Sequence, residues 1–394
     1  MAARTVLFGA TGYTGRLVAE AMVERGLTPV LAARSRDKLE ALAEELGGGL
    51  ETAVADVSDP PSVAALVERG DVLVTTVGPF ARWGGPAAAA ATTAGAHYLD
   101  STGEPAFIRE VFERYGLAAE GSGAAMLTAF GYDWVPGNLA GALALREAGD
   151  EAVRIDVGYF FTGQASPSGG TQATMAASLG DPGYVYRDGR VQTERTAKRV
   201  RSFQVGSKQR DAVSVGSSEH FTLPRIAPQL REVNAYLGWF GPMSRPMQVL
   251  SLGASLPGAS RLLKMAGERF VKGSTGGPDA EARKRCGSHI AAIAYDGAGR
   301  ELAEVHVTGV DAYTFTGRVL AWGAQLAAEG GLQGTGALGP VDAFGLVALT
   351  DGCRWAGLKE EGATRGDSAD APPTDGAPET GSHETAAKGS GPKA

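Results

Sequence analysis

The sequence predicts an α/β protein, with an N-terminal doubly wound parallel sheet followed by a mixed α+β second domain. Three observations lead to this prediction. Short apolar runs alternate with helical patterns over residues 1–145. Three glycines spaced three apart, Gly9, Gly12 and Gly15, lie where the first apolar run meets the first helical pattern. Beyond residue 150, β-rich runs follow one another without regular helices between them, which is typical of a mixed or antiparallel sheet.

The first strand, turn and helix predict a phosphate site. TVLF (residues 5–8) suits a strand buried on both faces, and RLVAEAMVERG (residues 16–26) reads as a helix. Glycines between them let the backbone bend and let a phosphate approach without meeting a Cβ, while the helix N-terminus offers free amides to an anion. Without these flanks a glycine triplet would fit an ordinary loop equally well. With them it predicts the seat of a dinucleotide diphosphate.

The same unit then repeats. TPVLAARS (residues 28–35) and DVLVTTVGPF (residues 71–80) read as further strands, and LETAVADVSD (residues 50–59) as a strand between them. RDKLEALAEELG (residues 36–47) and PSVAALVERG (residues 61–70) read as the intervening helices. Alternation at this pace predicts a Rossmann-type domain.

The end of the second strand favours NADP(H) over NAD(H). An NAD site usually places Asp or Glu there to bind the ribose 2′-hydroxyl, whereas arginine binds a 2′-phosphate. This chain has Ala33 at that position, followed by Arg34. A solvated helix start is the alternative interpretation of the nearby charges. The predicted cofactor-binding residues lie at the glycine turn and at the ends of the second, third and fourth strands: Gly9, Thr11, Gly12, Tyr13, Thr14, Gly15, Arg34, Ser35, Lys38, Asp56, Val57, Val77, Gly78, Pro79 and Phe80.

Composition excludes several classes of protein. A formal charge of −7 and a pI near 5.4 argue against nucleic-acid binding. Cys286 and Cys353 lie far apart, and the five histidines are widely spaced, so the sequence predicts no metal site and no disulfide framework. It also predicts no signal peptide and no membrane-spanning run, and therefore a cytoplasmic protein.

Several stretches together resemble a known family. VLFGATGYTGRLVAE (residues 6–20), GAHYLDSTGE (residues 95–104) and GYDWVPGNLAG (residues 131–141) are similar to saccharopine-dehydrogenase-like reductases, in particular to the branch called trans-acting enoyl reductases. The resemblance covers roughly residues 4–350. SGGT (residues 168–171) resembles the start of that family's second domain. Where the family turn usually carries small polar residues, this chain has Trp134, Gly137 and Asn138, which suggests a different, bulkier substrate.

The resemblance implies hydride transfer from NADPH to a conjugated C=C bond of an acyl, lipid or polyketide-like intermediate, free or carrier-bound. It places Tyr98, Asp100, Gly103 and Glu104 along the cofactor cleft, near Tyr132 and Asp133. The candidate proton donors are Tyr98, Glu104, Tyr132 and Asp133; the alternative for each is a structural hydrogen bond. The predicted substrate contacts are Gly103, Trp134, Gly170 and Thr171.

Two rival functions remain open. One is oxidation or reduction at a C=N bond, as in saccharopine dehydrogenase. An acidic amino-acid substrate would require clustered arginines; Arg195, Arg199 and Arg201 alternate in a way that favours a solvated strand face. The other rival is a non-catalytic NADP-binding scaffold. Short-chain dehydrogenase chemistry is excluded, because none of the tyrosines is followed by a lysine four residues later.

The expected domains are residues 1–145, which bind NADP, and residues 146–358, which bind substrate and form a homodimer. As an alternative, the last helices of the second domain pack back on the first domain. Residues 223–272 are expected to form a helical excursion with exposed aromatics, a candidate for peripheral membrane contact. Residues 359–394 are poor in apolar side chains and are expected to be disordered.

Overall fold

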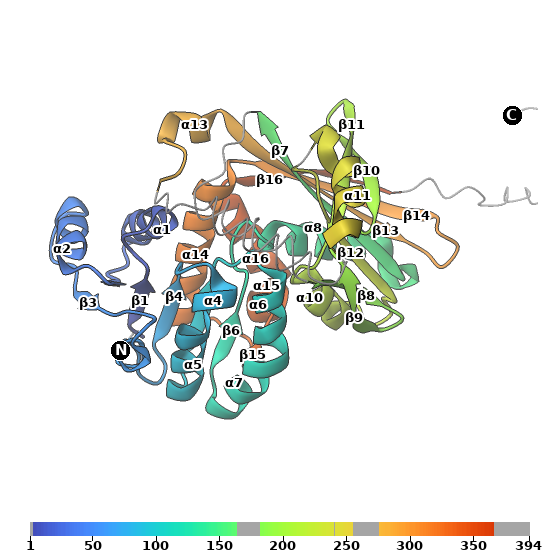
Figure 1. Cartoon of the computed structure of the whole chain (residues 1–394). Coiled ribbons are helices and arrows are strands. Elements are labelled where there is room, and N and C mark those ends of the chain that lie inside the picture. Colours follow the sequence, from blue (N-terminus) through green and yellow to red (C-terminus); the bar gives the residue numbers. More distant parts are fainter. Residues whose placement is uncertain (1–2, 164–181, 240, 255–275, 366–394) are drawn as a thin grey trace, which may run out of the picture.

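The computed structural model describes residues 3–163, 182–239, 241–254 and 276–365. Two sheets organise these residues, one on either side of a shared layer of helices (Figure 1). Both the predicted fold class and its two parts are confirmed: a parallel N-terminal sheet and a mixed second sheet.

The first sheet has, in the described residues, seven parallel strands in the order β15-β6-β5-β4-β1-β2-β3. Its strands are β1 (Thr5–Phe8), β2 (Val30–Ala33), β3 (Thr52–Val54), β4 (Val72–Thr75), β5 (His97–Asp100), β6 (Ala125–Leu127) and β15 (Gly336–Ala337). Strands β1, β2 and β4 are buried along their whole length, because helices cover both faces of the sheet. Reversal of the strand order beside β1 creates the crevice in which such folds bind ligands.

Helices cover the two faces of this sheet as two separate apolar cores. The elements in the first 151 residues are α1 (Tyr13–Glu24), α2 (Arg36–Glu45), α3 (Pro60–Ala64), α4 (Phe80–Trp83), α5 (Gly85–Ala94), α6 (Pro105–Glu110), the π-helix η1 (Val111–Tyr115), α7 (Gly116–Ser122), α8 (Val135–Ala148) and the 3₁₀ turn η2 (Gly149–Glu151). Leu7 and Leu31 face the core beneath α1 and α2, whereas Val6 and Phe8 face the core beneath α3 and α5. Alternate side chains of one strand thus enter opposite cores.

The chain returns to the first sheet near its end. The elements α14 (Ala312–Ala328), α15 (Pro340–Phe344) and α16 (Leu346–Trp355) follow the second sheet, and α14 packs against α1. Gly317 makes this approach close, since a Cβ there would come within 2.9 Å of the Leu17 carbonyl oxygen. Together with β15, these helices place part of the expected second domain in the first layer.

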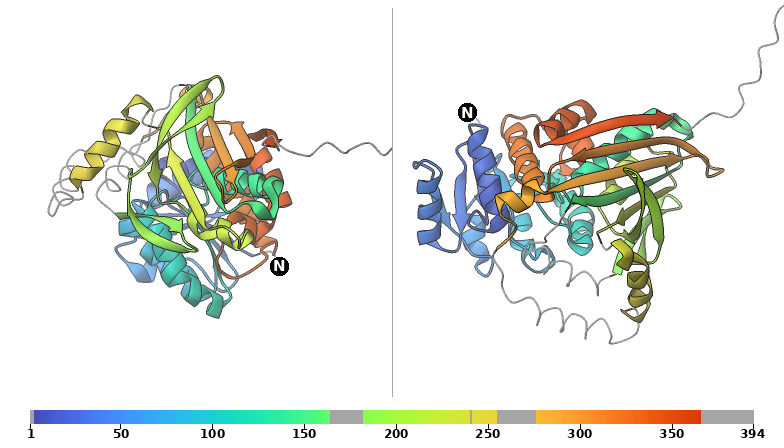
Figure 2. Two further views of the ribbon diagram at one scale, coloured as in Figure 1. Left: turned by 90° about the vertical axis from the view of Figure 1, so that its right-hand side faces the viewer. Right: turned by 90° about the horizontal axis from the view of Figure 1, so that it is seen from above.

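The second sheet is mixed, with both parallel and antiparallel strand pairs (Figure 2). Its strands are β7 (Arg154–Gly163), β8 (Pro182–Arg187), β9 (Arg190–Arg195), β10 (Val200–Val205), β11 (Lys208–Val215), β12 (Glu232–Leu237), β13 (Cys286–Tyr295), β14 (Glu301–Gly309) and β16 (Leu358–Arg365). Strand β12 runs parallel to β7, and the other pairs are antiparallel. Its inner face packs on α8. Its outer face carries a smaller apolar cluster around Phe160 and Phe203.

The prediction of a helical excursion over residues 223–272 is wrong for residues 232–237, which form a strand. The described elements there are α10 (Glu219–Ile226), β12, η3 (Gly241–Met243), α11 (Ser244–Ala254) and, after it, α13 (Ala280–Lys284). The run EVNAYL (residues 232–237) alternates and pairs with β7 as a strand. Tyr236 is 5% exposed and Trp239 stacks on Phe161 at 4.9 Å, so these two aromatics do not form an exposed patch. Phe240 and residues 255–275 lie outside the described residues.

The C-terminal boundary also differs from the prediction. Residues 358–365 form β16 at the edge of the second sheet beside β14, so the expected disordered tail does not begin at residue 359. Residues 366–394 lie outside the described residues. In the described part of the chain, none of the helices combines the length and apolar character needed to cross a membrane.

Candidate active site

The glycine turn lies at the carboxyl ends of β1 and β4. Gly9 has φ of +92°, and a Cβ there would come within 2.8 Å of Thr76 Oγ1 and 2.9 Å of Val77 Cγ2. A Cβ on Gly15 would overlap with the Gly9 carbonyl oxygen. The Gly12 N–H donates to that same oxygen at 3.0 Å. The turn therefore closes only with glycine at Gly9 and Gly15.

This turn fits a diphosphate. Gly12 is the exposed N-cap of the 12-residue helix α1, and the first turn of that helix carries neither an acidic residue nor a side-chain cap. The first amides of a helix have no intrahelical acceptor, and they lie at the positive end of its dipole. Thr11 and Thr14, both half-buried, flank these amides. An anion of phosphate type supplies the acceptors that this end of α1 lacks.

Tyr13 ties the glycine turn to the second half of the chain. Its hydroxyl donates to the Pro278 carbonyl oxygen at 2.5 Å and accepts from Arg283 at 3.1 Å, and its ring lies edge-on to Tyr313. A Cβ on Gly277 would come within 2.5 Å of the Tyr13 ring. One side of the predicted cofactor site is thus closed by the segment before α13.

Arg34 and Asp56 approach each other at the ends of β2 and β3. Arg34 is exposed directly after β2, and Ser35 is the N-cap of α2, with Lys38 exposed in its first turn. Hydrogen bonds from Ser58 lower the pKa of Asp56, and the positive charge of Arg34 lowers it further. Val57 is half-buried beside them. This is where a ribose 2′-phosphate would lie on a fold of this kind.

The loop after β4 is fixed by Glu104. The carboxylate of Glu104 accepts hydrogen bonds from the Phe80 N–H at 2.7 Å and the Ala81 N–H at 2.9 Å, and the residue is 3% exposed. Phe80 packs on Phe107, with ring centroids 5.7 Å apart. Val77, Gly78 and Pro79 form the loop in front of them. The structure therefore gives Glu104 a positioning task, which corrects its selection as a proton donor.

Tyr98 is also removed from the set of proton donors. Its side chain is fully buried in the core on the far face of the first sheet, where it cannot meet a substrate. Burial raises its pKa well above the usual value. Neighbouring Asp100 accepts from the backbone N–H groups of Thr102 and Ala129, both at 2.9 Å. Burial raises the pKa of Asp100 to about 6 despite these bonds.

Tyr132 supports the cleft rather than lining it. The residue is 3% exposed, its ring stacks on Phe161 at 5.6 Å, and its hydroxyl lies 3.4 Å from the Phe160 carbonyl oxygen. Burial raises its pKa well above the usual value. Its backbone N–H donates to Thr316 Oγ1 at 3.0 Å. Tyr132 thus joins β6, β7 and α14, and this enclosed position corrects its selection as a proton donor.

Asp133 is the remaining candidate. It lies after β6, against the loop that follows β5: a Cβ on Gly103 would come within 2.6 Å of Asp133 Oδ2. The residue keeps partial exposure, while its Oδ1 atom is buried and has no hydrogen-bond partner among the described residues. Burial raises the pKa of Asp133 to about 7. The structure therefore brings Asp133 and Gly103 together at the carboxyl ends of β5 and β6, on the same edge of the sheet as the glycine turn.

Two functional candidates, Tyr159 and Glu219, were missed by the sequence interpretation. The Tyr159 hydroxyl lies 2.5 Å from Glu219 Oε1, accepts from the Gly137 N–H at 2.8 Å and lies 3.0 Å from the Trp134 carbonyl oxygen. A hydroxyl has one proton, which Tyr159 donates either to Glu219 Oε1 or to the Trp134 carbonyl oxygen. Burial raises the pKa of Glu219 to about 7, and the charge of Asp133 also raises it.

The only local signal for Glu219 is Ser218, which precedes it at the start of α10 and marks a helix start. His220 follows it, and burial lowers the pKa of this imidazole to about 4, so it is neutral. Because β7 brings Tyr159 to α10 from 60 residues away, spacing along the chain could not reveal the pair.

The predicted substrate residues are not all in place. Gly103 borders Asp133, as described above. Trp134 is 1% exposed and packs edge-on against Tyr159 at 5.0 Å, so the structure corrects its selection as a substrate contact. Gly170 and Thr171 lie outside the described residues.

Comparison with known proteins identifies the first domain. Residues 5–125 match the family described as saccharopine dehydrogenase NADP-binding domain. The match confirms the predicted resemblance and the predicted cofactor, NADP(H). The glycine turn and the end of β2 both lie within the matched residues.

Curated relatives carry the name trans-acting enoyl reductase. One from Mycobacterium tuberculosis strain H37Rv is 39% identical over 139 residues, which are 34% of this chain and 33% of that protein. One from Mycobacterium ulcerans is 33% identical over 183 residues, or 44% of each chain. The matched stretches thus cover only 33% and 44% of the lengths of these two relatives.

The fold extends beyond the matched stretch. Saccharopine dehydrogenase (L-Glu forming) from Saccharomyces cerevisiae superposes with a TM-score of 0.56 at 11% identity, over 91% of this chain and 99% of the yeast protein. At this identity the superposition establishes a shared fold across both sheets. The domain match adds that residues 5–125 resemble an NADP-binding domain.

Proposed function

We propose that the chain is an NADPH-dependent enoyl reductase that reduces a C=C bond conjugated to the carbonyl of an acyl, lipid or polyketide-like substrate, free or carrier-bound. The observation that carries the proposal is Asp133, a carboxyl whose Oδ1 is buried without a partner in the described chain, beside Gly103. The names of the curated relatives point to the same reaction class.

The cofactor would be held by this chain's backbone and one side chain. The glycine turn and the first amides of α1 would bind the diphosphate, and Arg34 would bind the 2′-phosphate. When bound, NADPH supplies a hydride. Glu104 fixes the loop after β4 through the Phe80 and Ala81 amides, which keeps that wall of the crevice in place.

Reduction of a C=C bond adds one hydride and one proton, so the site needs a proton donor. A carboxyl with a pKa near 7 is partly protonated at neutral pH, which suits general-acid catalysis. The pKa of Asp133 is raised because burial destabilises its charged form. Within the described residues, no hydrogen-bond donor stabilises a negative charge on its Oδ1. Gly103 allows its loop to lie against the carboxyl, since a Cβ there would come within 2.6 Å of Asp133 Oδ2.

Glu219 would assist Asp133 electrostatically. The charge of Asp133 raises the pKa of Glu219, and the Tyr159 hydroxyl lies 2.5 Å from Glu219 Oε1. Two acids that resist ionisation in one buried region favour at least one remaining proton at neutral pH. Glu219 is thus a positioning residue, whereas Asp133 is the candidate that meets the substrate.

The arginine placement favours C=C over C=N reduction. Arg201 pairs with Asp156 on the outer face of β7, whereas Tyr159 and its neighbour Trp134 lie on the inner face. An acidic amino-acid substrate bound at Asp133 would therefore lack these arginines as partners.

The test is NADPH oxidation, followed at the absorbance of the reduced nicotinamide, with a panel of enoyl thioesters, cyclic imines and quinones. Steady oxidation with an enoyl thioester is the expected result. Oxidation with an imine alone would replace the proposal by C=N reduction. Tight NADPH binding without oxidation across the panel would replace it by a scaffold function.

A further inference from the structure

A hollow of about 460 Å³ opens on the outer face of the second sheet, bordered by β7, β10, β12 and α11. It lies at the start of β7, at Arg154, whereas Tyr132 contacts Phe160 near the other end of that strand. Six residue steps along a strand span about 20 Å. The hollow is therefore distinct from the cofactor crevice.

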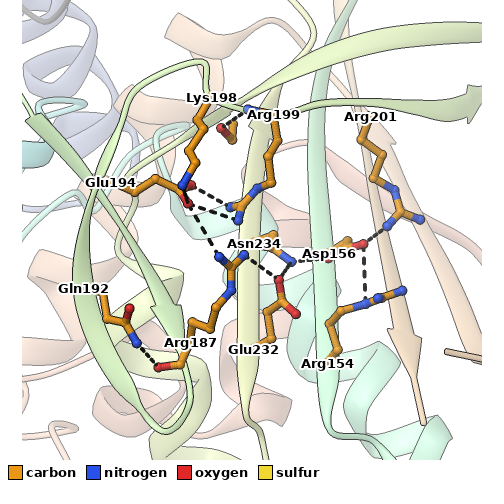
Figure 3. A network of polar contacts seen from close by, with 11 residues as sticks. Arg154, Asp156, Arg187, Gln192, Glu194, Lys198, Arg199, Arg201, Glu232 and Asn234 are labelled. Atoms are coloured by element: carbon orange, nitrogen blue, oxygen red, sulfur yellow. Dashed lines mark hydrogen bonds and ion pairs between the residues drawn. The ribbon is translucent and has the colours of Figure 1, made fainter. Parts of the chain in front are cut away.

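Charged side chains line and support this hollow (Figure 3). The cations are Arg154, Arg187, Lys198, Arg199 and Arg201, and the carboxylates are Asp156, Glu194 and Glu232. Among the lining residues, Arg154, Lys198, Arg199 and Arg201 outnumber Asp156 and Glu232 by two charges, in a chain whose formal net charge is −7. A local surplus of this sign attracts anions.

The carboxylates hold the cations in fixed positions. Glu194, 8% exposed, lies 3.0 Å from Arg199 and 3.3 Å from Lys198. Asp156, 2% exposed, pairs with Arg201. Arg201 also donates to the Tyr295 hydroxyl, so its guanidinium is held from two sides. The cationic groups are thus ordered before any ligand arrives, which reduces the entropy cost of binding.

Donors remain unused in this arrangement. The Nε atoms of Arg154, Arg199 and Arg201 are buried and have no hydrogen-bond partner within the described ranges. A network that only fastened strands together would balance its charges and satisfy its donors. This one has excess positive charge, three Nε donors without a hydrogen-bond partner in the described chain, and an adjoining hollow.

We propose that this hollow binds the phosphate group of a small ligand. Guanidinium groups present paired donors that match phosphate oxygens, and a dianion would neutralise the surplus charge. The phosphate has two sources to distinguish: free inorganic phosphate, and a phosphate ester such as coenzyme A. The second source, which would tether an acyl substrate, rests on the proposed function; phosphate binding itself does not.

The experiment is calorimetric titration of the full chain with inorganic phosphate and, separately, with coenzyme A. Saturating NADPH is present in both arms, so that the glycine turn is filled and heat reports the hollow. Lys198→Gln is the test variant, because its side chain is 53% exposed and Glu194 keeps Arg199 as a partner after the change. Lys208→Gln is the matched control: it removes the same charge at the exposed start of β11, beside the turn that follows β10, and does not line the hollow.

We expect Lys198→Gln to weaken phosphate binding roughly fivefold and Lys208→Gln to leave it unchanged, with affinity falling as salt rises. Gln248→Glu, which places a negative charge at the rim from α11 without removing any ion pair, should weaken binding at least as much. If coenzyme A binds more tightly than phosphate and its binding is weakened equally by these substitutions, the ligand is a phosphate ester. If only inorganic phosphate binds, the ligand is the free ion.

Two results would overturn the proposal: absence of binding by the wild-type chain, or equal affinities for Lys198→Gln and Lys208→Gln. Retention of the fold is checked by the NADPH affinity of each variant, which the hollow does not affect. Failure of the wild-type chain to bind NADPH would count against the proposed function and leave the phosphate result to stand alone.

Discussion

Buried carboxyl groups occur in two regions of this molecule, and their surroundings have opposite effects on their charge. Between the two sheets, Asp133 and Glu219 have neutral neighbours, and burial raises the pKa of each to about 7. On the outer face of the second sheet, Asp156 and Glu194 are paired with arginines, and Arg187 helps to lower the pKa of Glu232. An unpaired buried acid keeps a proton that chemistry can use, whereas a paired acid stays charged and orders the cations around it.

The largest expected effect separates these two kinds of acid. Asp133→Asn should lower kcat about 10²- to 10⁴-fold, because the amide cannot donate a carboxyl proton, while NADPH affinity is retained. Asp71→Asn is the matched control: it removes a buried acid paired with Arg4 at 3.0 Å and should cost stability but not turnover. Steady-state kinetics and NADPH fluorescence check both. Equal turnover in wild type and Asp133→Asn would end the role of Asp133.

Glu219→Gln sharpens the comparison through stability. Because the folded pKa of Glu219, about 7, lies above its unfolded value, the wild type loses stability as pH rises from about 4.5 to about 7. The glutamine variant lacks this ionisation. Relative to the variant, the wild type should lose on the order of 3 kcal/mol across that range and then level off. Urea unfolding of both proteins along a pH series measures the difference.

If the difference in unfolding free energy between the wild type and Glu219→Gln did not change with pH, this expectation for Glu219 would be wrong. If the wild type instead lost stability relative to the variant as pH falls, Glu219 would be paired and charged in the folded state, like the acids of the outer face.

Gly137→Ala tests how tightly the region around Glu219 is packed. A Cβ there would overlap with the Tyr159 hydroxyl and with Glu219 Oε1, so we expect a loss of about 2–3 kcal/mol. Gly121→Ala in α7 is the control, since its Cβ would meet nothing within 4 Å and should be neutral or slightly stabilising. Urea denaturation compares the two. A Gly137→Ala protein as stable as the control would show that the Tyr159–Glu219 contact is loose.

Sequence reasoning reaches candidate residues that are neighbours in the chain, and it misses contacts that depend on strand pairing. The glycine turn and Arg34 could be proposed as cofactor contacts because a strand, a turn and a helix follow one another within 30 residues. Asp133 was found through a family resemblance, although its burial could not be. Glu219 was invisible, because its partner Tyr159 comes from a strand 60 residues earlier.

The second sheet shows the same limit. Arg199 and Arg201 alternate along the chain like a solvated strand, which is how they were interpreted. Asp156 reaches Arg201 only because β7 and β10 are strands of the same sheet, and the chain order does not specify that arrangement. Likewise, EVNAYL (residues 232–237) became a strand because β7 and β11 lie on either side of it, which overrode the apparent helical context.

Arg34→Ala gives the smallest of these effects. Loss of a charge-assisted phosphate contact should weaken NADPH binding by about 2 kcal/mol, roughly 30-fold, and leave NADH binding nearly unchanged. Lys38→Ala, exposed one turn later in α2, should have a weaker effect. Titration of the nicotinamide fluorescence with both coenzymes measures this selectivity. An equal loss for NADPH and NADH would refute the placement of the 2′-phosphate at Arg34.

The protonation of Asp133 can be measured directly by infrared difference spectroscopy of wild type against Asp133→Asn, with NADP⁺ bound. The carbonyl stretch of a protonated carboxyl disappears when the group ionises. We expect this band to persist at about pH 6 and to be lost with a midpoint near 7. Loss of the band below about pH 5 would show an ordinary charged aspartate and rule out Asp133 as a proton donor at neutral pH.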